Sequence, residues 1–181
     1  MEMLEGEIDP LVKALARSSV SLASDLLIRA GANVNARNNF GVSPLALASE
    51  QGNATIIEQL MKAGADPNDP LNFVNAGETP LMHAARAGSV DAVNALVWAG
   101  TKINARETWN KQSALMWAAA EGNGPIVQAL IDGGADIHAR SGGDTTPLMF
   151  AVRKGDMRSV QALLAAGADV NEQRVDLATP L

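Results

Sequence analysis

The sequence predicts an all-α solenoid in which helix–turn–helix units stack side by side. Three short markers recur in one phase along the 181 residues. A Gly-Ala-like pair begins at Gly31, Gly64, Gly100, Gly134 and Gly167, in steps of 33, 36, 34 and 33 residues. A Thr-Pro-Leu-like triplet begins at Ser43, Thr79, Ser113, Thr146 and Thr179, in steps of 36, 34, 33 and 33 residues. A third marker, glycine followed by a polar residue, lies between these two at Gly52-Asn53, Gly88-Ser89, Gly122-Asn123 and Gly155-Asp156. Markers that recur in one order at steps of 33 to 36 residues indicate a structural repeat.

Each marker has a physical role within one unit. Ser or Thr followed by Pro provides a helix N-cap and a first helical residue. We therefore predict a helix over 80–87, which Gly88 ends in a left-handed turn. A second helix is predicted over 90–98, where the apolar residues recur at helical spacing. The polar, turn-rich stretch 101–112 then forms an extended loop. Such a unit cannot bury its apolar face alone, so neighbouring units must stack.

The whole chain, 1–181, is predicted to form a single domain of repeated units. The first unit is irregular, since Ser18-Ser19 stands where the other units have a glycine turn, as expected for an N-terminal cap. The units span about 9–37, 38–75, 76–106, 107–140 and 141–174, with a partial sixth at 175–181.

Composition excludes several classes of function. The chain carries 20 acidic and 14 basic residues, and this acidic balance argues against a nucleic acid partner. It has no apolar run long enough for membrane insertion. It has no cysteine, and hence no disulfide and no thiolate metal site. The compartment is not indicated: a cytoplasmic location is slightly favoured, and a secreted or periplasmic one would need a signal already removed.

The units resemble the ankyrin repeat family. The resemblance rests on Glu78-Thr79-Pro80-Leu81-Met82-His83-Ala84-Ala85-Arg86-Ala87-Gly88 and on Leu163-Leu164-Ala165-Ala166-Gly167-Ala168-Asp169-Val170-Asn171, and it extends over nearly the whole chain. The unit that contains Met116-Trp117-Ala118-Ala119-Ala120-Glu121-Gly122-Asn123 is most similar to ankyrin proteins of bacteria. The family usually has His after Thr-Pro-Leu. Here that position carries Ala46, Met82, Met116 and Met149, and we expect the methionines to lie in the core.

The resemblance implies a protein-binding module whose partner contacts the loop tips and a concave face of the inner helices. The position after the replaced His would face that surface. It carries a stripe of apolar and aromatic residues, namely Leu47, His83, Trp117 and Phe150. Aromatic residues commonly anchor binding hot spots. Packing between inner helices explains the same stripe equally well, and both interpretations stay open.

Two further sets of candidate contacts follow from position. The charged residues before each helix-ending glycine would face the same groove, and they are Glu50, Arg86, Glu121, Arg153 and Lys154. The aromatic residues expected in loops are Phe40, Phe73 and Trp109. We expect Trp109 to contact a partner, and Phe40, also a candidate contact, to pack beside Gly41. Trp98 occupies an outer-helix position where a polar residue is more usual. It either covers the next loop or marks a second patch.

We expect no catalysis, no cofactor and no metal ion. His83 and His138 occupy different positions in different units, and no pair of residues has the spacing of a metal site. The expected partner is another protein. Two alternatives remain, a recognition arm of a longer enzyme or effector, and a peptide or small-ligand binder at the aromatic stripe.

The sequence stops at Thr179-Pro180-Leu181, the first turn of a sixth unit. A fragment of a longer array is the favoured explanation. The alternative is self-association through an uncapped end, where Leu163 and Val160 would be exposed and Leu177 and Leu181 would take part.

Overall fold

Paired helices build the fold. The structure is a computed structural model that describes residues 10–15, 21–69 and 77–171. Within these residues all regular structure is helical. The helices are α1 (Pro10–Leu15), α2 (Ser21–Arg29), α3 (Pro44–Glu50), α4 (Ala54–Lys62), α5 (Pro80–Ala87), α6 (Val90–Trp98), α7 (Ala114–Glu121), α8 (Gly124–Asp132), α9 (Pro147–Lys154) and α10 (Met157–Ala165). The predicted helices 80–87 and 90–98 are confirmed as α5 and α6.

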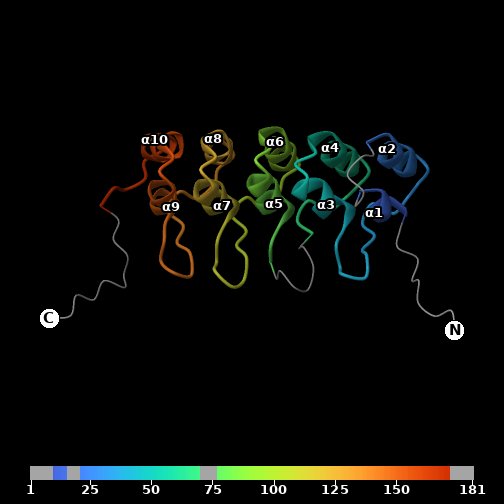
Figure 1. The fold of residues 1–181 in the computed structure, drawn as a ribbon, viewed down its shortest axis with the longest axis horizontal. Coiled ribbons are helices and arrows are strands. Elements are labelled where there is room, and N and C mark those ends of the chain that lie inside the picture. Colours follow the sequence, from blue (N-terminus) through green and yellow to red (C-terminus); the bar gives the residue numbers. More distant parts are fainter. Residues whose placement is uncertain (1–9, 16–20, 70–76, 172–181) are drawn as a thin grey trace.

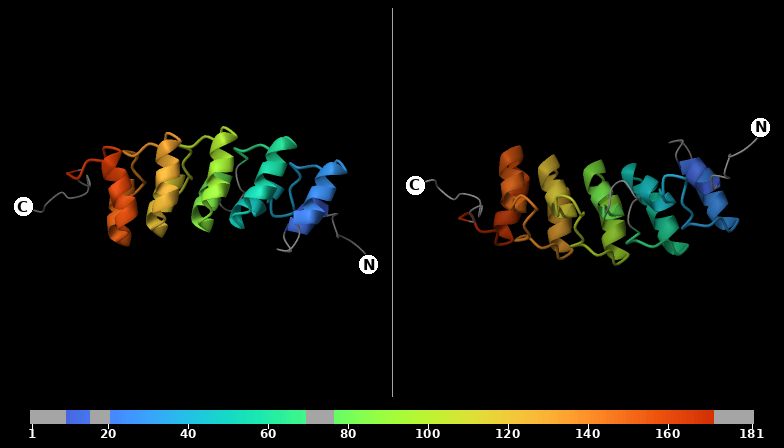
Figure 2. Two further views of the ribbon diagram at one scale, coloured as in Figure 1. Left: turned by 90° about the horizontal axis from the view of Figure 1, so that it is seen from above. Right: turned by 90° about the horizontal axis from the view of Figure 1, so that it is seen from below.

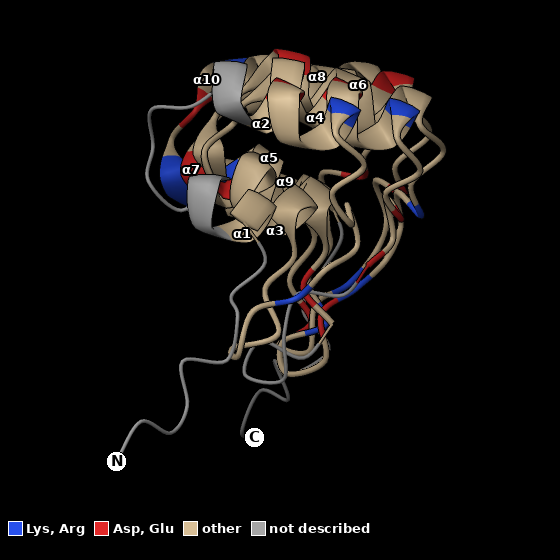
Figure 3. Ribbon diagram, turned by 90° about the vertical axis from the view of Figure 1, so that its right-hand side faces the viewer, with Lys and Arg blue, Asp and Glu red and all other residues tan. Residues whose placement is uncertain are grey.

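The helices form two rows that run the length of the molecule (Figure 1). The odd-numbered helices make an inner row and the even-numbered helices an outer row, and each helix packs on its partner and on its neighbours in the row. The outer helices lie side by side when the molecule is seen from above (Figure 2). The loops project from the inner row in one direction. An end-on view therefore shows helices above and loops below (Figure 3).

Inner helices begin and end as the repeated markers predict. The side-chain oxygen of Thr79 accepts a hydrogen bond from the Met82 backbone N–H at 3.3 Å, and Ser43, Ser113 and Thr146 cap their helices in the same way. Gly88 ends α5 with a φ of 80°, in the left-handed region that favours glycine. These local signals set the length of each inner helix.

The core is continuous from unit to unit. Leu45, Leu81 and Leu115, the leucines of successive triplets, are fully buried. Met82 and Met116 are also fully buried, which confirms that they are core residues. Met149, in the last described unit, is half-buried.

Asparagine side chains join successive loops. Asn104 donates from Nδ2 to the Gly134 carbonyl at 3.3 Å, and its Oδ1 accepts from the Asp136 backbone N–H at 2.8 Å. Asn35 makes the same pair of bonds, to Gly64 and Asp66. These bridges fix the orientation of one loop relative to the next.

Candidate functional site

The stripe of four residues predicted for the concave face is only partly accessible. His83 and Phe150 are buried, whereas Leu47 and Trp117 are half-buried and pack against the core. The packing interpretation therefore accounts for His83 and Phe150. Trp117 keeps an accessible part, and the charged residues around it are exposed.

His83 lies at the centre of a polar network that joins two units. Its Nε2 is 2.7 Å from Oε2 of Glu78, a buried residue just before the α5 N-cap. Its Nδ1 is 3.4 Å from Nη2 of Arg86 and 3.2 Å from Oε1 of Glu50 on α3. Burial lowers the pKa of His83 below 6.5 although the hydrogen bond with Glu78 opposes this shift. In the neutral ring, Nε2–H donates to Glu78 and Nδ1 accepts from Arg86.

Arg86 connects this network to the next unit. Its guanidinium carbon lies 5.2 Å from the centre of the Trp117 ring on α7, within the range of cation–π attraction. The His83 and Trp117 ring centres are 6.0 Å apart and tilted by 45°. The guanidinium is therefore held between an imidazole and an indole while the Arg86 residue itself stays exposed.

A shallow hollow of about 170 Å³ lies beside this contact. It is lined by Arg86, Gln112, Trp117, Ala120 and Glu121. The Trp117 Nε1 atom is buried and has no hydrogen-bond partner among the described residues. Such a volume is large enough for one side chain, but it lies below the range of about 300–1,000 Å³ that is typical of small-molecule pockets.

A second cation is held against an aromatic ring at α9. The guanidinium carbon of Arg153 lies 4.8 Å from the centre of the Phe150 ring. Arg153 and Lys154 are both exposed at the end of this inner helix, as are Glu50 and Glu121 at the ends of α3 and α7. We call the surface formed by Glu50, Arg86, Trp117, Glu121, Arg153 and Lys154 the inner-helix surface.

Trp109 and Phe40 both face solvent, whereas the third loop aromatic, Phe73, lies outside the described residues. Trp109 is 74% exposed and Phe40 is 76% exposed. The expectation that Phe40 packs on its neighbour is wrong. The reason is local, because Asn38 Oδ1 accepts from the backbone N–H groups of Phe40 and Val42 and closes the turn without help from the ring.

Glu107, which sequence reasoning passed over, holds the Trp109 loop in shape. Its carboxylate is buried and accepts from the backbone N–H groups of Trp109 at 2.8 Å and Gln112 at 2.9 Å. It also accepts from Asn110 at 2.9 Å. Its place two positions before the loop tip is the sequence feature that could have indicated this role. Trp109 is therefore presented by a loop with a defined backbone.

The exposed end of the last described unit differs from the sequence expectation. Leu163 is fully buried, so the expectation that it is exposed is wrong, because it occupies the same core position as Leu60, Leu96 and Leu130. Val160 is half-buried. Among the exposed apolar residues of this unit are Val152, at 61%, and Val170, at 68%, and the equivalents of Val152, Ala85 and Ala119, are buried. Leu177 and Leu181 lie outside the described residues.

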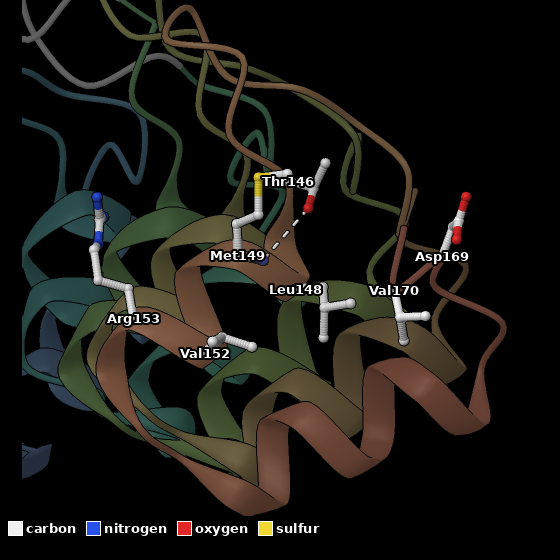
Figure 4. Close-up of a pocket in the computed structure, with 7 residues that line it drawn as sticks. All are labelled: Thr146, Leu148, Met149, Val152, Arg153, Asp169 and Val170. Carbon is white, nitrogen blue, oxygen red and sulfur yellow. Dashed lines mark hydrogen bonds between the residues drawn. The ribbon is translucent and has the colours of Figure 1, made fainter. Parts of the chain in front are cut away.

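A groove of about 320 Å³ marks this end (Figure 4). Leu148, Met149, Val152 and Val170 supply its apolar part, with Arg153 and Asp169 at its margins. Within the described ranges, no helix is long and apolar enough to cross a membrane.

Comparison with known proteins gives a consistent family. The model described as "Ankyrin repeats (3 copies)" matches residues 11–107 and again residues 99–174. The p105 subunit of nuclear factor NF-kappa-B from Gallus gallus is 32% identical over 141 residues, which is 77% of this chain and 14% of that protein. Cyclin-dependent kinase 4 inhibitor B from Bos taurus is 36% identical over 108 residues, 59% of this chain and 77% of the inhibitor. The human palmitoyltransferase ZDHHC17 is 30% identical over 130 residues, 55% of this chain and 21% of the enzyme.

These relatives are eukaryotic, so the expectation of a bacterial type has no support. The chain spans only a small part of p105 and of the palmitoyltransferase. Ankyrin repeats are protein-interaction modules, typically without catalysis of their own. The two family matches and the paired, stacked helices agree, and the chain belongs to the ankyrin repeat family.

Proposed function

We propose that this chain binds another protein through the inner-helix surface and the Trp109 loop. The observation that carries the proposal is the contact of Arg86 with Trp117 across two units. A guanidinium held against an indole ring has lost part of its freedom before binding. Docking a partner then costs less conformational entropy than it would at a mobile arginine.

Charge indicates the kind of partner segment that this surface would accept. The protein has a net charge of −6, yet Arg86, Arg153 and Lys154 place three cations on the inner-helix surface. Two of them lie over aromatic rings. A segment that presents acidic side chains beside apolar groups would complement this arrangement.

The proposal can be tested by comparing what matched variants retain from an extract. The two chains used to capture proteins are the wild type and the double variant Arg86→Ala/Arg153→Ala. The control is Lys62→Ala, which removes an exposed cation from outer helix α4. We expect a partner that wild type and the control retain equally and that the double variant loses. Retention of the same proteins by all three chains would contradict the proposal. Circular dichroism shows whether the double variant keeps its helices.

The relatives favour one further possibility for the same surface. The match to a palmitoyltransferase covers 21% of that enzyme. A repeat array of this kind can therefore serve as the recognition arm of an enzyme, and in that case the inner-helix surface selects the substrate protein. The small-ligand alternative receives less support, because the hollow beside Trp117 is only about 170 Å³.

We also propose that the groove beside Val152 takes a second copy of the chain. The positions of Leu148, Met149 and Val152 are buried in the preceding two units, and the groove margins carry one cation and one anion, Arg153 and Asp169. Two copies facing each other could pair Arg153 of one with Asp169 of the other. Light scattering over a concentration series should show a dimer that Val152→Asp abolishes, and a monomer at all concentrations would contradict this second proposal.

A further inference from the structure

The most exposed large apolar side chain among the described residues belongs to the outer row. Trp98, in the last turn of α6, is 82% exposed. The equivalent positions of the other units carry Arg29, Lys62, Asp132 and Ala165. The repeat therefore does not require an aromatic residue here. Trp98 also lies outside the inner-helix surface, because α6 belongs to the outer row (Figure 2).

A groove of about 370 Å³ runs beside Trp98 between α6 and α8. Val97 and Ala129 give it an apolar wall, and Asn94, Gln128 and Asp132 give it polar edges. Gln128 donates from Nε2 to Asp132 Oδ1 at 2.7 Å, which holds the carboxylate in place. The lining contains one acidic residue and no Lys or Arg.

The electrostatics of this groove are unusual for a helix end. Asp132 is the last residue of α8, where the carbonyl groups already give a partial negative charge. A cation is favoured at such a position, and α2 and α4 have Arg29 and Lys62 there. In α8 the residue at this position, Asp132, carries a negative charge instead. A positive charge supplied from outside would relieve this repulsion.

We propose that the groove between α6 and α8 binds an Arg or Lys side chain on a basic segment of a partner protein. The cation would lie over the Trp98 ring and pair with Asp132. Asn94 and Gln128 are placed to accept further hydrogen bonds through their amide oxygens. Charge complementarity selects this occupant, because the groove combines an aromatic face with a carboxylate and a helix C-terminus. This groove shares no residue with the inner-helix surface.

The test uses the full chain and a defined probe, an acetylated and amidated tetra-arginine peptide. Its binding is followed by the indole N–H signals of the three tryptophans in ¹⁵N-correlation NMR spectra, with Trp98 assigned from Trp98→Phe. We expect a saturable shift centred on Trp98. Asp132→Asn and Trp98→Ala should each weaken binding about tenfold. In Trp98→Ala, binding is read from the backbone signals of α8.

A matched control separates this site from general attraction to an acidic protein. Asp91→Asn removes one carboxylate from the first turn of the same helix α6 and should leave the affinity unchanged. Asp132→Lys should abolish binding while raising the thermal midpoint, since it restores a cation at the helix C-terminus. A variant that merely misfolded would lower that midpoint.

Three outcomes would overturn the inference. One is equal loss of affinity in Asp91→Asn and Asp132→Asn. Another is an equal shift of Trp98 with tetra-glutamate. The third is a concentration-dependent dimer of the chain alone that Trp98→Ala removes, which would make a second copy the occupant.

Discussion

The guanidinium of Arg86 lies 5.2 Å from the centre of the Trp117 ring, which belongs to the following repeat. This contact joins the last turn of α5 to the middle of α7. The buried His83 contacts the same guanidinium through Nδ1, at 3.4 Å. A residue of the core thus fixes the position of a residue on the surface, and this relation underlies the proposed binding of a partner.

Two substitutions distinguish the contribution of the Trp117 ring to stability from the contribution of its indole nitrogen. Trp117→Ala should destabilise the chain by about 1–3 kcal/mol, because the half-buried ring packs against the core and against Arg86. Trp117→Phe should change stability by less than about 1 kcal/mol, since it keeps a ring and removes the unpartnered Nε1. Urea unfolding followed by circular dichroism measures both. An equal loss of stability in the two variants would indicate that the indole nitrogen has a hydrogen-bond partner that stabilises the fold.

His83 should make stability depend on pH. Its folded pKa is lowered by burial, so the unfolded chain binds the proton more readily. The contribution of His83 is therefore complete above its unfolded pKa of about 6.5 and is lost as the pH falls below that value. His83→Gln keeps a donor for Glu78 but does not titrate. Denaturation midpoints between about pH 7.5 and 5.5 should fall more steeply for wild type than for the variant. Parallel slopes would contradict this assignment.

Short sequence signals at the two ends of the inner helices make this part of the fold predictable from the sequence. A Ser or Thr side chain caps the start of α5, α7 and α9, with Pro as the first helical residue in α5 and α9, and glycine ends each helix, so both limits are readable locally. The accessibility of His83 and Phe150 depends instead on the units packed against them. The sequence alone therefore does not distinguish a binding role of the stripe from a packing role. The same reason explains Leu163, whose burial comes from its position in the shared core.

His138 replaces an asparagine at a position where other units use that residue to connect successive loops. Asn35 and Asn104 each bond to the carbonyl of a helix-ending glycine and to an aspartate N–H of the next unit. His138 stands at the equivalent position, and no such bond to the next unit is found for it among residues 77–171. His138→Asn should bridge to Gly167 and Asp169 and stabilise the chain by about 0.5–1.5 kcal/mol. Thermal unfolding checks this, with His138→Ala as the control that cannot form the bridge.

Lys111 adopts a backbone conformation that favours glycine. Its φ is 55°, and Gly41 and Gly77 occupy the equivalent position with φ values of 75° and 90°. A side chain in this region costs free energy that glycine avoids, while glycine loses more entropy on folding. We expect Lys111→Gly to stabilise the chain by about 0.5–1 kcal/mol. Lys102→Gly, in the preceding turn, is the comparison, and it should not stabilise. A loss of stability in Lys111→Gly would show that the lysine side chain makes a needed contact.

The most direct test of the proposed binding surface is hydrogen–deuterium exchange of the chain with and without its captured partner. We expect slower exchange in the C-terminal turns of α5, α7 and α9 and in the Trp109 loop. Exchange in outer helices α4 and α10 should be unchanged apart from any site of self-association. Protection confined to the outer row, with α5 and α7 unaffected, would contradict it.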